Sequence, residues 1–104
     1  MSKLVRDKIP EIMIVKNKNP KIKIITNDLE YFSFLTKKLL EEVDEFIEAS
    51  NKSEKHFAEE EMADVLEVIE AICKFKNYDD LAIQKYKLNK KYERGGFEKR
   101  IILE

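Results

Sequence analysis

The sequence is poor in residues that break helices and in residues that cross-link a chain. Its 104 residues include only two glycines, two prolines, one cysteine and one histidine, and no tryptophan. So few glycines and prolines disfavour a small all-β fold, which needs many tight turns. The single cysteine, Cys73, excludes an internal disulfide and a cysteine-based zinc site, and the lone His56 excludes a histidine cluster.

Charge of one sign and long apolar runs are also missing. There are 20 lysines and arginines against 21 aspartates and glutamates, a formal net charge of -1. Without a basic excess, bulk charge gives no reason to expect a nucleic acid as partner. No apolar run approaches the roughly 20 residues of a membrane span, and the first residues lack the apolar core of a secretory signal. We therefore expect a cytoplasmic protein that binds neither nucleic acid nor membrane.

The residues that are present favour helices around one modest core. Charged residues make up 39% of the chain and apolar residues 43%. That apolar share suffices for a single domain over residues 1–104. The apolar residues recur at helical spacing. They predict a helical turn at 9–15 and long helices over about 28–50, 53–76 and 79–94.

Capping and breaking residues mark the expected ends of these helices. Asn27 and Ser53 are suitable N-caps for the first two long helices, and Gly95 is a suitable stop for the last. Outside the helices, apolar residues alternate at 21–26, which predicts a short strand that could pair with the apolar tail at 98–103. The expected fold class is therefore mainly α, an antiparallel helix bundle with one small β pairing.

Two acidic stretches carry the most information about function. Glu42 and Glu45 lie three residues apart, on one side of a helix, and like charges at this spacing repel. The next helix repeats the spacing with Glu61 and Asp64, and antiparallel packing would bring the two pairs together. A hard divalent cation such as Mg²⁺ takes oxygen ligands and removes the repulsion. The alternative is a solvated acidic face without any metal.

The acidic pattern, together with both ends of the chain, resembles a known superfamily. Glu41-Glu42-x-x-Glu45, followed after fifteen residues by Glu61-x-x-Asp64, is similar to the EExxE…ExxD signature of the all-α nucleoside triphosphate pyrophosphatases. That superfamily includes MazG proteins, phosphoribosyl-ATP pyrophosphohydrolase and dimeric dUTPases. Lys3 to Pro10 (KLVRDKIP) and Glu93 to Phe97 (ERGGF) resemble the short, single-domain, predicted house-cleaning branch of the MazG superfamily.

The resemblance implies a fold, an enzyme activity and a site. The fold is the antiparallel bundle of the all-α pyrophosphatases. The activity is hydrolysis of the α–β phosphoanhydride of a nucleoside triphosphate to a monophosphate and pyrophosphate, and the clearing of non-canonical nucleotides is one role that it suggests. Glu41 would be either a further metal ligand or, as favoured here, the group that orients or deprotonates the attacking water. By similarity, the ligands of Mg²⁺, or of Mn²⁺ in its place, are Glu42, Glu45, Glu61 and Asp64.

Basic residues near both ends are candidates for binding the substrate's phosphates. A triphosphate is highly charged and needs cations besides the metal. Arg6 and Lys8 precede a turn fixed by Pro10, which would hold them in place. Arg94 precedes Gly95 and its neighbouring glycine, where bare backbone can approach a phosphate closely.

A second copy of the chain is the expected partner besides the nucleotide. The apolar arc of the helix at 53–76 is wider than a small monomer needs to bury. The superfamily usually completes its site with a second subunit, so the resemblance implies a homodimer or a homotetramer. Two other interpretations stay open: a phosphoribosyl-ATP pyrophosphohydrolase, and a non-catalytic helical module that binds nucleotide or metal.

Overall fold

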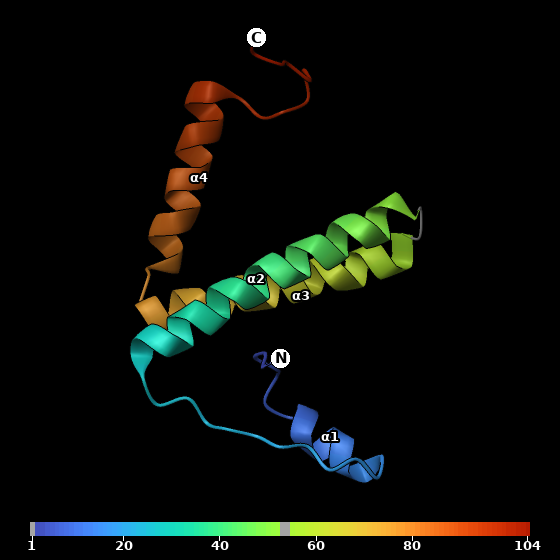
Figure 1. Cartoon of the computed structure of the whole chain (residues 1–104). Helices are drawn as coiled ribbons and strands as arrows, with labels where there is room; N and C mark the ends of the chain where they lie inside the picture. The colour runs from blue at the N-terminus through green and yellow to red at the C-terminus, as the bar shows by residue number, and fades with distance from the viewer. Residues whose placement is uncertain (1, 53–54) are drawn as a thin grey trace. The chain divides into compact units, whose positions relative to one another are not determined.

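The computed structural model describes residues 2–52 and 55–104, and these residues form four α-helices and no strand (Figure 1). In chain order the helices are α1 (Ile9–Val15), α2 (Asp28–Asn51), α3 (Lys55–Lys76) and α4 (Asp80–Arg94). The prediction of a mainly α fold is confirmed. None of these helices combines the length and the apolar character that crossing a membrane requires.

Local sequence explains where the helices begin and end. The Asn27 side chain accepts a hydrogen bond from the Glu30 N–H at 2.9 Å, and so caps α2 as predicted. Asp79 caps α4 in the same way, accepting from the N–H groups of Leu81 and Ala82. α4 ends at Arg94 and is followed by its C-cap residue Gly95, whose φ of 84° is one that glycine adopts without strain. The predicted cap at Ser53 lies outside the described residues.

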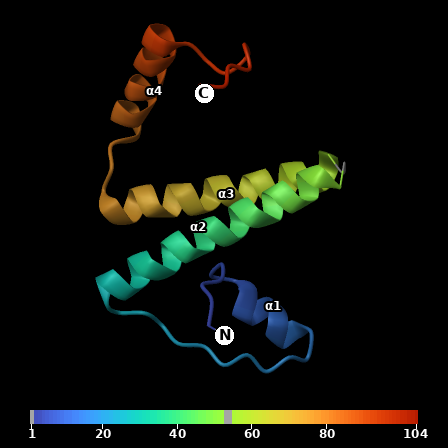
Figure 2. The same ribbon diagram turned by 45° about the horizontal axis from the view of Figure 1, so that its top comes forward.

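The chain divides into two compact units, residues 1–72 and 73–104. The prediction of a single domain over 1–104 stays a prediction. In the first unit, α2 and α3 run antiparallel and side by side in both views (Figures 1 and 2). Their shared core is small: Leu35 on α2 and Val65 on α3 are the buried apolar residues of the described chain. The second unit contains the end of α3, then α4 and the tail.

The expected β pairing between residues 21–26 and 98–103 is wrong. Neither segment forms a strand. Ile22 and Ile24 remain 63% and 76% exposed, and Ile101 is 78% exposed. A strand takes its register from a face that is buried, and neither segment has one. The alternation of isoleucine with lysine at 21–26 therefore occurs in a solvated segment without strand structure.

Candidate functional site

Three carboxylates converge between α2 and α3. Glu42 and Glu45 project from one side of α2 because they are three residues apart, and Glu61 meets them from α3. One oxygen from each lies within 4.8 Å of the others. Glu42 is buried, with only 6% of its surface exposed. The helix pair thus brings together three of the four predicted metal ligands.

Two of these carboxylates have buried oxygens, and not all of these oxygens have a hydrogen-bond donor. Among the described residues, Glu42 Oε2 and Glu61 Oε2 are buried side-chain oxygens without a hydrogen-bond donor. Such orphaned oxygens are rare in folded proteins because desolvating a carboxylate is costly. Hard divalent cations prefer carboxylate oxygens as ligands. The donor set and the orphaned oxygens therefore fit a metal ion.

Burial and neighbouring negative charges raise the pKa of two of these carboxyl groups, Glu45 and Glu61. Partial burial of the Glu45 carboxylate, followed by the charge of Glu42, raises the pKa of Glu45 from 4.5 to about 7. Burial also raises the pKa of Glu61, and the charges of Asp64 and Glu42 act in the same direction. Without a metal ion, protons therefore take up part of the negative charge near neutral pH.

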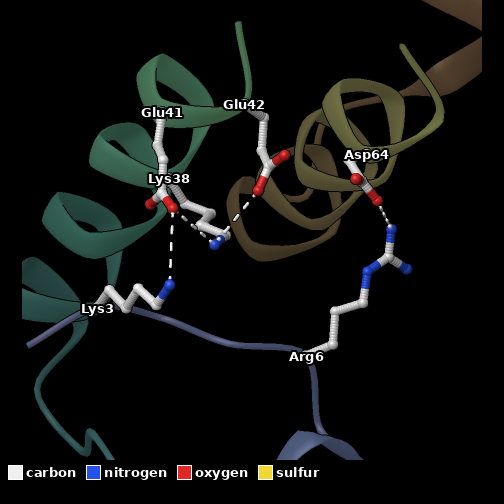
Figure 3. Close-up of polar contacts among 6 residues, drawn as sticks. All are labelled: Lys3, Arg6, Lys38, Glu41, Glu42 and Asp64. Carbon is white, nitrogen blue, oxygen red and sulfur yellow. Dashed lines mark hydrogen bonds and ion pairs between the residues drawn. The ribbon is translucent and has the colours of Figure 1, made fainter. Parts of the chain in front are cut away.

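Asp64, the fourth predicted ligand, is not part of this group of three. Its Oδ1 accepts a hydrogen bond of 2.7 Å from Arg6 Nη2 (Figure 3). The N-terminal segment that carries Arg6 runs along the helix pair, and Figure 3 shows the guanidinium pointing from it towards α3. The role of Asp64 as a metal ligand stays a prediction. The hydrogen bond brings Arg6 close to the acidic site, by which we mean Glu42, Glu45, Glu61 and Asp64.

Glu41 and Glu42 share a cation, Lys38, that is not among the predicted site residues. Lys38 Nζ lies 3.4 Å from Glu41 Oε1 and 3.3 Å from Glu42 Oε1 (Figure 3). Burial alone would lower the pKa of Lys38, but the two carboxylates outweigh it and raise that pKa. A lysine three and four residues before adjacent glutamates was the available signal for this contact.

A pocket of about 220 Å³ adjoins this acidic site within the first unit. Its lining includes three basic side chains, two carboxylates and the apolar residues Val5 and Ile9. The charged members are Lys3, Arg6, Lys38, Glu42 and Asp64. Of the predicted phosphate-binding residues, Arg6 therefore lines the pocket. Lys8 is the N-cap residue of α1 and is not among the lining residues, and Arg94 is the last residue of α4, in the second unit.

Comparison with known proteins gives one family. A family model described as the MazG nucleotide pyrophosphohydrolase domain matches residues 31–94, more than half of the chain. The matched region contains α3, α4 and most of α2, and with them all five acidic residues of the predicted signature. No curated protein and no solved structure matches the chain.

Proposed function

Since this chain belongs to the MazG nucleotide pyrophosphohydrolase domain family, we propose that it is a Mg²⁺-dependent nucleoside triphosphate pyrophosphohydrolase. It cleaves the α–β phosphoanhydride and releases a nucleoside monophosphate and pyrophosphate. The proposal is carried by the convergence of Glu42, Glu45 and Glu61, whose ligand atoms lie within 4.8 Å of one another inside the matched region. Non-canonical nucleotides are the proposed physiological substrates.

The reaction consumes one water molecule. Its oxygen forms a bond to one phosphorus of the α–β anhydride, while the bond from that phosphorus to the bridging oxygen breaks. The bridging oxygen keeps the electron pair and leaves with the other phosphorus. The protons released by the water pass to a base and then to solvent. We assign Glu41 to orient and deprotonate this water, since its carboxylate shares the Lys38 ammonium with that of Glu42 and is therefore held near the three converging carboxylates.

The other residues of the site have two roles: some would bind the metal ion, and others would bind the phosphates of the substrate. Glu42, Glu45 and Glu61 would hold the divalent ion, and bound there it would neutralise phosphate charge and acidify a nearby water. Asp64 would join this set if Arg6 released it. The planar guanidinium of Arg6, which suits phosphate oxygens, would then be available to the substrate.

Product analysis tests the proposed reaction. The purified protein is incubated with Mg²⁺ and a panel of canonical and modified nucleoside triphosphates. We expect monophosphate plus pyrophosphate, lost on adding EDTA. Glu42→Gln and Asp64→Asn should abolish turnover with helicity unchanged, whereas Glu48→Gln, an equal charge change farther along α2, should retain it. Diphosphate plus phosphate as products, or full activity of Glu42→Gln, would refute the assignment.

A second copy of the chain is the proposed partner. α2 and α3 leave large apolar side chains exposed, among them Leu40 at 66%, Leu66 at 58% and Ile47 at 50%. A stable monomer rarely leaves so much apolar surface in water. Light scattering after size exclusion should give a homodimer or homotetramer, and Leu66→Glu should shift it towards monomer. A monomeric wild type at micromolar concentration would contradict this.

A further inference from the structure

Lys38 is the most enclosed of the three cations that line the pocket. Its side chain is 17% exposed, whereas those of Lys3 and Arg6 are 64% and 54% exposed. The phosphate contacts assigned so far do not use it. We propose that Lys38 is a phosphate-binding residue, and that the pocket it shares with Arg6 and Lys3 takes the β,γ-diphosphate end of the substrate. This inference rests on the proposed function and places one part of the substrate within the site.

The position of the Lys38 ammonium is set before any substrate arrives. Its Nζ lies 3.4 Å from Glu41 Oε1 and 3.3 Å from Glu42 Oε1. An ammonium has three N–H donors, so these two carboxylates leave a third for another acceptor. A side chain that is already ordered loses little conformational freedom when it binds a ligand, which favours Lys38 over the exposed lysines nearby.

Charge explains why the phosphates need the metal as well as Lys38. Six carboxylates, those of Glu41, Glu42, Glu45, Glu61, Asp64 and Glu67, lie in or beside the site that contains the three cations Lys3, Arg6 and Lys38. The difference, three minus six, is a formal charge of -3, which would repel a phosphate. One divalent ion would reduce it to -1. The three basic side chains would then face the phosphates against a much smaller opposing charge.

The size of the pocket limits what it can hold. Pockets that enclose whole small ligands have about 300–1,000 Å³, and this one has about 220 Å³. It is open to solvent and too small to enclose a complete nucleotide. Apolar atoms supply more of its surface than polar atoms, and its polar groups are the charged ends of Lys3, Arg6, Lys38, Glu42 and Asp64. The base and the sugar are expected to bind outside it.

Titration with inorganic pyrophosphate tests this inference apart from catalysis. Binding of pyrophosphate at fixed Mg²⁺, and of Mg²⁺ alone, is measured by calorimetry for the wild type, Lys38→Met and Lys38→Arg. Losing a charged hydrogen bond should weaken pyrophosphate binding by about tenfold or more in Lys38→Met. Mg²⁺ affinity should hold or increase, since a repelling cation is gone. Lys38→Arg should recover part of the pyrophosphate affinity.

Lys37→Met is the matched control because it removes the same charge from the next residue. Lys37 Nζ lies over the Phe34 ring, 5.5 Å from its centroid, and Lys37 does not line the pocket. Pyrophosphate affinity should be unchanged in this variant. If Lys38→Met binds pyrophosphate like the wild type, or loses Mg²⁺ affinity instead, then Lys38 only supports Glu42 and the inference is wrong.

A second measurement needs no variant. Mg²⁺ with pyrophosphate should protect Lys38, but not Lys37, from an amine-reactive reagent in the wild-type protein, as read by mass spectrometry. Absence of protection at saturating pyrophosphate would overturn the inference. Turnover of nucleoside triphosphates by the same preparation is measured in parallel. Turnover without protection of Lys38 leaves the proposed function standing, whereas protection without turnover of any triphosphate refutes the function alone.

Discussion

Glu45→Gln should stabilise the metal-free protein at pH 8 while weakening its stabilisation by Mg²⁺. Glu45 is the member of the acidic group whose pKa is raised to about 7, from 4.5. A carboxyl whose pKa is higher in the folded state favours folding below its unfolded pKa and loses that contribution as pH rises through the folded value. The metal-free wild type should therefore lose stability between about pH 5 and pH 8, and the glutamine variant should lose less.

Coulomb's law sets the size of this effect. The ligand oxygens of Glu42, Glu45 and Glu61 lie within 4.8 Å of one another. At that separation two unit charges repel by about 1 kcal/mol in a water-like dielectric, which suits Glu45 better than a buried value because Glu45 is an exposed residue whose carboxylate is only partly desolvated. Glu45 has two such neighbours. Its neutral replacement should therefore raise the free energy of unfolding by about 1–2 kcal/mol at pH 8, and change it little at pH 5.

Urea unfolding in EDTA, followed by circular dichroism at both pH values, measures the difference. Glu48→Gln serves as the control: Glu48 pairs with Lys52 and lies outside the acidic group, so no gain is expected. Addition of Mg²⁺ should reverse the order of stability of the two proteins, because the variant lacks one of the proposed metal ligands. A Glu45→Gln protein that is less stable than the wild type in EDTA at pH 8 would refute the idea that these carboxylates repel.

Three further outcomes follow from the same contacts. Mg²⁺ at a hundred times its dissociation constant should stabilise the wild type by about 2.7 kcal/mol, seen as a rise in Tm, and Glu42→Gln should lose most of this rise. Arg6→Ala should tighten Mg²⁺ binding, because it frees Asp64, but should raise KM for the triphosphate. Weaker Mg²⁺ binding by this variant in calorimetry would contradict the idea that Arg6 competes with the metal for Asp64. Leu35→Ala should lower the free energy of unfolding by about 2–5 kcal/mol in urea titrations, since the Leu35 side chain is 2% exposed. A loss below about 1 kcal/mol would show that burial of Leu35 contributes little to stability.

Local patterns predict the helices of this chain well. The start of α2 depends on Asn27 and the end of α4 on Gly95, and both act within a few residues of their own position. The spacing of Glu42 and Glu45 likewise determines which side of α2 they share. The prediction of a β pairing failed because the alternation at 21–26 is a property of that segment alone. A strand also needs a partner and a buried face, and both are properties of the folded chain.

Contacts between distant segments could not be predicted in the same way. Arg6 and Asp64 are 58 residues apart, and no spacing rule connects them. The sequence predicts a different role for each of them: Arg6 as a phosphate-binding residue and Asp64 as a metal ligand. Their direct pairing depends on the path of the N-terminal segment along α2 and α3. Lys38 was missed for another reason: it lies in a lysine pair on a charged helix. Its spacing to Glu41 and Glu42 was a local signal, but its burial, which Lys37 does not share, is a property of the folded chain.

The small core gives the acidic group more influence on stability than it would have in a larger domain. With Leu35 and Val65 as the buried apolar residues of the described chain, hydrophobic burial between α2 and α3 is modest. The same helix pair buries Glu42 and leaves oxygens of Glu42 and Glu61 unpaired, which opposes folding. A divalent ion bound at the interface of the two helices would remove that penalty where it arises. We therefore expect metal binding and the packing of α2 on α3 to be coupled, so a variant that weakens one should weaken the other.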